Sequence, residues 1–183
     1  FSFKNQGLGH PILIGREAQV ERTMEQMGVP AGTLEIINAR LSDNNPVYTD
    51  FLYSRLQRDG YLKRDVQRLV NQDRNIFGCC MLKNGDADGM VTGVTRNYDV
   101  ALNDALLVLD ALPDKALMGM SMVIKRGRTV FIADTSVTEL PQGEDLANIA
   151  LEAADAVRAM GFVPRVAFLS YSTFGNPMGE RGE

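Results

Sequence analysis

Polar side chains follow predicted strands at several points, and their types suit an anionic ligand. The first group lies in VTGVTRNY, residues 91–98, and comprises Gly93, Thr95, Arg96 and Asn97. The glycine permits close backbone approach, Thr95 and Asn97 offer neutral hydrogen bonds, and the arginine offers a positive charge. In open α/β sheets ligands bind at the carboxyl ends of strands, so this segment is one candidate wall of a ligand cleft.

A second group follows the apolar run VAFL, residues 166–169, in the sequence SYSTFGN. Its hydroxyls and glycine could converge on an anion, the candidates being Ser170, Ser172, Thr173 and Gly175. Asp134 and Thr135 end the run FIADT and form a third candidate wall. The same residue types also populate ordinary loops, so the residues alone leave a phosphate or acyl phosphate site and plain turns both open.

Several common kinds of site are not predicted. The sequence has no G-x-x-x-x-G-K-[ST] loop and no G-x-G-x-x-G after a strand. NGDADG places Asp86 and Asp88 at alternate positions but lacks the remaining ligands of an EF-hand, which favours a turn. A single histidine, His10, argues against a His-based triad or a multi-His zinc site. We therefore expect no metal site in these residues.

Composition narrows the class of protein. The chain has 183 residues, is 45% apolar and has a formal net charge of −4, with no Lys/Arg-rich tract. It is long enough to bury a core, and it lacks the basic surface that nucleic acid requires. No apolar run is long enough to span a membrane, and the first residues lack a signal-peptide pattern. We expect a cytoplasmic protein whose partner is a small molecule or another protein, with neither nucleic acid nor membrane as a partner.

Two further features each admit a structural interpretation. Cys79 and Cys80 are adjacent within IFGCCML, so we expect reduced core residues rather than a disulfide or a metal ligand pair. A basic stretch consists of Arg55, Arg58, Lys63, Arg64, Arg68 and Arg74. Interleaved aspartates favour a solvated helical surface with local ion pairs, and the alternative is a rim that attracts a phosphorylated ligand.

Alternating apolar patterns predict an α/β fold. Strands are expected over residues 11–15, from Leu34 onward, over 89–93 and over 166–169. Helices are expected over 16–27, after Asn45-Pro46, over 63–73, over 75–85 and after Tyr98. The segment around Arg126-Gly127 predicts an antiparallel hairpin. A last helix begins after Pro141 and ends at Gly161, with an apolar stripe of Leu146, Ile149, Ala150, Ala153, Val157 and Met160.

Three segments together resemble the phosphate acetyltransferase and butyryltransferase family. They are HPILIG, ADGMVTG and the long run from Phe131 to Gly175. GVTRNY and STFGNPMGER resemble the branch that forms the C-terminal domain of bacterial NADP-dependent malic enzymes. The resemblance implies a three-layer α/β/α fold with a mostly parallel sheet, an antiparallel hairpin, and two lobes around a cleft for coenzyme A and acetyl phosphate. The lobes would be residues 1–94 and 95–183, each partial, and the domain would form a homo-oligomer.

The chain departs from the family pattern where the phosphate would bind. Active members have Ser-Gly-Ala-x-His-Thr-Thr after this strand and an arginine further along the helix. Aligned without gaps from Gly93, the histidine position is Arg96, the threonine pair is Asn97 and Tyr98, and the helix arginine is Asn103. Asparagine cannot replace the charged, bidentate grip of arginine on a phosphate. Tyr98 and Asn103 thus join the candidate ligand-binding residues.

Three functions follow from the resemblance. The first is a non-catalytic regulatory and oligomerising domain that binds acetyl-CoA or a related acyl ligand, in a parent chain that converts malate to pyruvate. NADP and Mg²⁺ or Mn²⁺ would bind an upstream domain of that chain, and this part would hold no cofactor beyond coenzyme A or acetyl-CoA as ligand. The second is an active phosphate acyltransferase, and the third a purely structural dimerisation domain. The family's later Ser-Arg pair and Asp are expected after Glu183 and the start of its domain before Phe1, so we expect a piece of a longer polypeptide.

Overall fold

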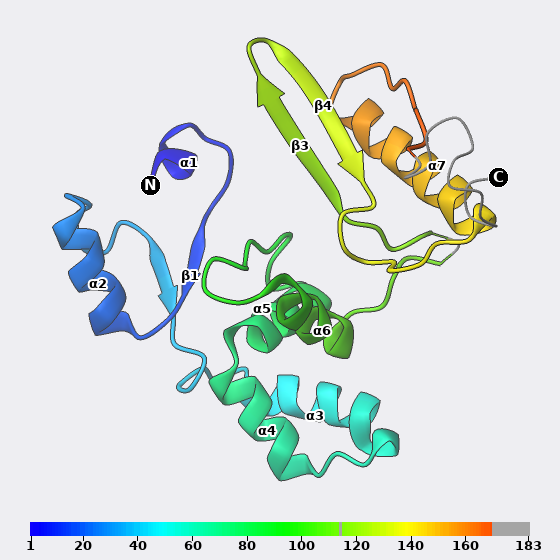
Figure 1. The fold of residues 1–183 in the computed structure, drawn as a ribbon. Coiled ribbons are helices and arrows are strands. Elements are labelled where there is room, and N and C mark those ends of the chain that lie inside the picture. The colour runs from blue at the N-terminus through cyan, green and yellow to red at the C-terminus, as the bar shows by residue number, and fades with distance from the viewer. Residues whose placement is uncertain (114, 170–183) are drawn as a thin grey trace. The chain divides into compact units, whose positions relative to one another are not determined.

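The computed structural model describes residues 1–113 and 115–169, and its described strands and helices form two compact units (Figure 1). Unit 1 comprises residues 1–110, and unit 2 the described residues from Ala111 onward. Both parallel and antiparallel strands occur, so the α/β class is confirmed. The lobes predicted for residues 1–94 and 95–183 stay a prediction, and the helix that follows residue 94 packs within unit 1.

Unit 1 begins with a strand–helix–strand arrangement. After the short helix α1 (Ser2–Asn5), strand β1 (Ile12–Ile14) pairs in parallel with β2 (Glu35–Ile37), and α2 (Glu17–Gln26) connects them. In the register, Leu13 lies opposite Ile36. Parallel strands need such a crossover, because the chain must return to the starting edge of the sheet before the second strand begins. The strands predicted over 11–15 and from Leu34, and the helix between them, are therefore confirmed.

Helices form the rest of unit 1. They are α3 (Asn45–Leu56), a short 3-10 turn (Gln57–Asp59), α4 (Lys63–Gln72), α5 (Arg74–Asn84) and α6 (Tyr98–Val108). Asp73 caps the start of α5 by accepting hydrogen bonds from two backbone N–H groups, and Gly85, with φ +79°, ends it in a left-handed conformation. All four predicted helices in this region are confirmed.

The core of unit 1 lies between these helices. Tyr48, Leu52, Val66, Val70 and Phe77 are fully buried or nearly so. The rings of Tyr48 and Phe77 meet edge to face, with centroids 5.3 Å apart. Partly buried side chains of β1 and β2 pack against the same cluster. One continuous apolar core thus holds the parallel strands on the helices.

Gly78 in α5 allows the closest approach within this core. A Cβ atom at this position would lie 2.6 Å from the sulfur of Met90 and 3.3 Å from Cδ1 of Ile14. The lack of a side chain therefore lets α5 accept β1 and the loop that contains Met90 at the same place. This packing sets the course of the chain as it leaves α5.

Unit 2 contains a hairpin and one long helix. Strands β3 (Met120–Lys125) and β4 (Arg128–Ala133) pair antiparallel around Arg126-Gly127, and α7 (Gly143–Ala159) contacts β4. A capping box of Gln142 and Asp145 starts α7. The predicted hairpin and last helix are confirmed. The predicted apolar stripe is only partly correct. Ile149 and Val157 are buried and Ala150 and Ala153 partly buried, but Leu146 is exposed, as is Met160 directly after the helix.

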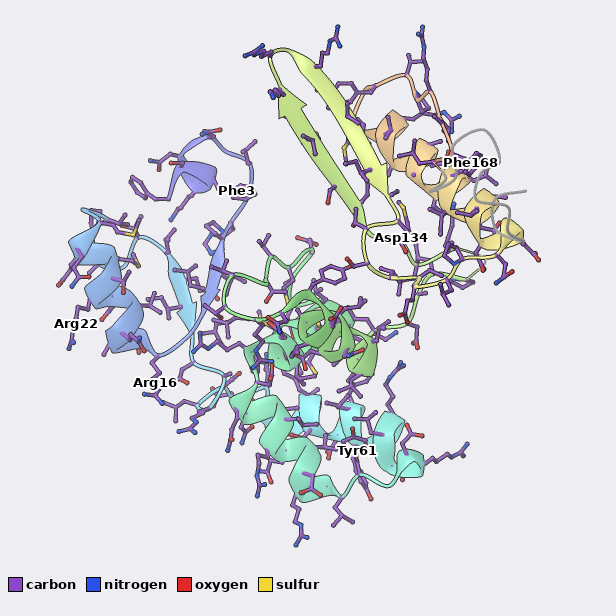
Figure 2. The ribbon with its side chains drawn as sticks, viewed as in Figure 1. Phe3, Arg16, Arg22, Tyr61, Asp134 and Phe168 are labelled. Atoms are coloured by element: carbon purple, nitrogen blue, oxygen red, sulfur yellow. The ribbon has the colours of Figure 1, made fainter. Side chains whose placement is uncertain are left out.

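Two predicted strands are wrong. Residues 89–93 and 166–169 form no strand, and both runs hold strongly exposed side chains such as Val91, Phe168 and Leu169 (Figure 2 labels Phe168). Strand β1 pairs only with β2, and β3 only with β4, among the described residues. A short apolar run predicts burial, but a strand also needs a neighbour to complete its backbone hydrogen bonds. Neither run has such a neighbour in the described part of the chain.

None of the helices in the described ranges, 1–113 and 115–169, combines the length and the apolar composition that crossing a membrane requires.

The core of unit 1 can be tested on α3 alone. Leu52→Ala removes a fully buried side chain, and we expect it to lower the free energy of unfolding by about 2–5 kcal/mol. Val47→Ala, on the same helix but 58% exposed, should change it by less than about 0.5 kcal/mol. Urea denaturation followed by circular dichroism measures both. Equal effects of the two variants would contradict this assignment of the core.

Both cysteines are free and buried, as predicted. Burial raises the pKa of the Cys79 thiol to about 11 and that of Cys80 to about 12, so the reactive thiolate is disfavoured. We expect neither thiol to react with a disulfide reagent in the native protein at pH 8, and both to react in denaturant. Rapid labelling of the native protein, followed by absorbance, would contradict this expectation.

Candidate functional site

An irregular loop of residues 85–97 joins α5 to α6, and its fixed points come from side chains. Met90 packs against the core, and the Thr92 hydroxyl donates to the side-chain oxygen of Asn75 at 2.5 Å. Val91, between these two points, is 99% exposed, and Val94, after them, is 95% exposed. Gly93 has φ +104°, a conformation that disfavours other residues. The loop is thus anchored at Met90 and Thr92 while its two valines face outward.

Arg96 is held by two carboxylates. Its guanidinium nitrogens lie 2.7 Å from Oδ2 of Asp73 and 2.6 Å from Oδ2 of Asp104. The hydrogen bond to Asp73 is the main reason that the pKa of Arg96 is raised above its usual value, with Asp104 contributing as well. We call the three residues Asp73, Arg96 and Asp104 the Arg96 clamp.

Both carboxylates of the Arg96 clamp have a second task. Asp73 uses Oδ1 to accept the backbone N–H groups of Asn75 at 2.9 Å and Ile76 at 3.3 Å, which caps α5. Oδ2 of Asp104 also accepts the side-chain amide of Asn75 at 2.9 Å. The clamp therefore connects the start of α5, the loop and the body of α6 in one hydrogen-bonded network.

The other end of α6 is held in a similar way. Arg55 forms a bidentate pair with Asp110, with distances of 2.9 and 2.7 Å, and also donates to the carbonyl oxygen of Leu107 at 2.9 Å. Arginine donors at a helix C-terminus satisfy carbonyl groups that lack helical partners. Lys63 likewise pairs with Asp50 at 2.6 Å. Both members of the basic stretch are thus in ion pairs, as its first interpretation predicts, but their partners are not the interleaved aspartates. Among those aspartates, Asp65 lies 3.9 Å from Arg64.

The remaining candidates of unit 1 lie around the start of α6. Thr95 and Asn97 are exposed loop residues, Tyr98 begins the helix half-exposed, and Asn103 is exposed further along it. Tyr98 lines a shallow, mostly apolar depression of about 510 Å³ whose other lining residues are Thr92, Gly93, Val94, Ala101 and Leu102. Gly93 and Tyr98 are thus brought together at this depression, in the same segment as the clamp.

In unit 2, Asp134 organises the turn that follows β4 (Figure 2). Its carboxylate accepts backbone N–H groups of Gly119 and Thr138, each at 2.6 Å, and of Ser136 and Val137 at longer distances. Burial alone would raise the pKa of Asp134, but these hydrogen bonds outweigh it and hold the pKa below its usual value. Thr135 donates its N–H to the carbonyl of Gly119. Both residues therefore fix the end of the hairpin, and a ligand contact by either stays a prediction.

A second depression, of about 550 Å³, lies on unit 2 along α7. Its Lys115 is already paired with Glu152 at 2.9 Å. Across residues 1–113 and 115–169, no three His, Cys, Asp or Glu side chains gather as ligands for a metal ion. Ser170, Ser172, Thr173 and Gly175 lie outside the described residues.

The partners of Arg96 were missed from the sequence. Asp73 has a local signal, since an aspartate directly before a helix is a typical N-cap. Asp104 has none, because only the fold of the loop brings Arg96 to the middle of α6. The sequence therefore identified Arg96 as a candidate but not the two carboxylates that pair with it.

A family model described as phosphate acetyl/butaryl transferase matches residues 2–183 of this chain. The chain belongs to this family. One similar member is an NADP-dependent malic enzyme from Rhizobium meliloti, which is 54% identical over all of this chain and 24% of its own length. Another is an NADP-dependent malic enzyme from Escherichia coli, which is 34% identical over 93% of this chain and 23% of its own length. A phosphate acetyltransferase from Corynebacterium glutamicum is 29% identical over 91% of this chain and 50% of its own. The chain thus spans about a quarter of the malic enzymes and about half of the transferase.

Solved structures agree with the family assignment. A phosphotransacetylase from Staphylococcus aureus matches with a TM-score of 0.77 and 26% identity, over 93% of this chain and 52% of its own. A phosphotransacetylase from Streptococcus pyogenes matches with a TM-score of 0.83 and 24% identity, over 98% of this chain and 55% of its own. The phosphotransacetylase fold predicted from the resemblance is therefore confirmed, apart from its two-lobe arrangement, which stays a prediction.

The hydrogen bonds to Asp134 predict an acid-sensitive unit 2. A folded-state pKa below the unfolded value means that ionised Asp134 stabilises unit 2 above about pH 4, and that this stability is lost as the pH falls through the folded-state pKa. Asp134→Asn should therefore lower the stability of unit 2 at pH 7 and flatten its loss toward pH 2. Glu139→Gln, at an exposed position nearby, should leave the profile unchanged. Unfolding followed by NMR between pH 2 and 7 measures this, and identical profiles for the two variants would contradict it.

Proposed function

We propose that this chain is an acyl-CoA-responsive domain of an NADP-dependent malic enzyme, at the C-terminal end of the parent chain. The similarity that supports this proposal most is the 54% identity with the Rhizobium meliloti malic enzyme across the whole of this chain. The parent chain would oxidise and decarboxylate malate to pyruvate. In this proposal NADP and Mg²⁺ or Mn²⁺ bind elsewhere in the parent chain, and the domain itself binds coenzyme A or acetyl-CoA without turning it over.

The Arg96 clamp supports a binding role over a catalytic one. A transferase must stabilise the negative charge that develops as a phosphate and an acyl group exchange. In this chain Arg96 stands where active family members have histidine, and its charge is already matched by Asp73 and Asp104. Asn103 stands at the position of the helix arginine and has no charge to offer. The depression beside Tyr98 can still accept a ligand without chemistry.

Regulation in this proposal is a coupling between two sites. An acyl-CoA that binds one arrangement of the parent protein more tightly shifts the population toward it, and so changes the affinity or rate at the malate site. Assembly into a homo-oligomer through this domain, in the cytoplasm, is part of the same proposal and offers one way to transmit the change. The purely structural role predicted as a third function lacks a ligand and would show no such coupling.

An active phosphate acyltransferase is the second candidate. The similarity to the Corynebacterium glutamicum phosphate acetyltransferase, which extends over 91% of this chain, favours it. Its reaction would move an acyl group between acyl phosphate and coenzyme A.

A pair of assays separates the candidates. In the full-length parent protein we expect acetyl-CoA to change the rate of malate-dependent NADP reduction, and no acetyl phosphate to form from acetyl-CoA and inorganic phosphate. Tyr98→Ala should raise the acetyl-CoA concentration needed for the half-maximal change in rate about tenfold, because one aromatic contact with the ligand is lost. Val100→Ala, a neighbouring exposed position outside the depression, is the matched control. Turnover to acetyl phosphate would favour the transferase instead, and no response to any acyl-CoA would leave only the structural role.

A further inference from the structure

The Arg96 clamp has more negative than positive charge. Two carboxylates face one guanidinium, and only 17% of the Asp73 side chain and 16% of the Asp104 side chain are exposed. Charges that are largely shielded from water interact strongly, because solvent and salt screen them less. A phosphate that approaches Arg96 would therefore meet two nearby carboxylates.

Neither carboxylate is free to move aside. Asp73 is fixed by the N–H groups that it caps at the start of α5, and Asp104 by the side-chain amide of Asn75. If a ligand displaced either carboxylate from Arg96, that carboxylate would stay largely buried without a positive partner. Leaving a buried charge unpaired costs free energy. The guanidinium is thus committed to the protein rather than to a ligand.

The depression next to the clamp has a different character. Apart from the Thr92 hydroxyl and the Tyr98 phenol, its lining side chains are hydrocarbon, namely Val94, Ala101 and Leu102, with Gly93 contributing backbone. The Thr92 hydroxyl is already donated to Asn75. An apolar lining beside net negative charge complements a neutral, partly apolar group and disfavours an anion.

We propose that the Arg96 clamp makes the 92–102 segment select the neutral acyl thioester end of its ligand and exclude inorganic phosphate and acyl phosphates. This inference rests on the proposed function, because it names which chemical part of an acyl-CoA this segment takes. The clamp residues act as specificity-determining and positioning residues: they hold the loop in place and supply the charge that rejects a phosphate.

Removing one carboxylate charge tests the proposal. Asp104→Asn keeps an oxygen that can accept from Asn75, and Asp73→Asn keeps a favourable N-cap, so both variants preserve the network while freeing positive charge on Arg96. We expect each to bind inorganic phosphate and acetyl phosphate roughly tenfold more tightly than the unchanged full-length protein, the size of one charge-assisted hydrogen bond. Asp99→Asn changes the net charge equally on the exposed start of α6 and should leave phosphate affinity unchanged. Isothermal titration of each phosphate compound measures the affinities.

Arg96→Gln gives the opposite test without relying on the carboxylate variants. If Arg96 were a phosphate ligand, the unchanged protein would bind phosphate measurably and this substitution would abolish that binding. The proposal instead expects no measurable phosphate binding at this segment in either protein, because Arg96→Gln only makes the clamp more negative. Measurable phosphate binding in the unchanged protein that Arg96→Gln abolishes, or equal affinities for Asp104→Asn and Asp99→Asn, would overturn the proposal. Acetyl-CoA is titrated separately into the unchanged protein, and failure there would refute the proposed function while leaving the phosphate results to decide on the clamp.

Discussion

The loop between α5 and α6 pairs with no strand in the described chain, so the packing of Met90 and side-chain hydrogen bonds fix its course. Backbone groups that cannot join a ladder are satisfied by side chains or water, and a loop that relies on water alone is poorly positioned. Here Thr92 and Arg96 provide fixed points in addition to Met90, through Asn75 and the two carboxylates. Gly93 and Thr95 lie between these two fixed points, and Asn97 directly follows the second.

The network also sets how α5 and α6 lie against each other. Asp73 begins α5 and pairs with Arg96, while Asp104 lies within α6 and pairs with the same guanidinium. At the far end, Arg55 from α3 holds the last carbonyl groups of α6. Arginine therefore ties the middle and the C-terminal end of α6 to other elements, and the buried side of the helix, where Val108 is fully enclosed, is kept on the core. A site on this helix has a rigid support, which is what precise ligand selection requires.

Local patterns predicted most elements because several of the helices carry clear start or stop signals. Asp73 and Gly85 mark the ends of α5, and Gln142 with Asp145 marks the start of α7. The two wrong strands, at residues 89–93 and 166–169, failed for the opposite reason. Their apolar residues give no information about a pairing partner, and a strand depends on one. The same limit applies to the site, because Asp104 becomes a partner of Arg96 only through the turn of the loop.

Charge at the Arg96 position shows why residue type alone is a weak guide to function. Taken from the sequence, an arginine in a glycine-containing loop predicts an anion site. In the fold, the same arginine faces Asp73 at 2.7 Å and Asp104 at 2.6 Å, and the local balance becomes negative. What a ligand encounters is the sum of the neighbouring charges and their shielding, not the charge of one side chain. The family fold is thus retained in this chain, while two carboxylates match and exceed the charge of the one arginine in this segment.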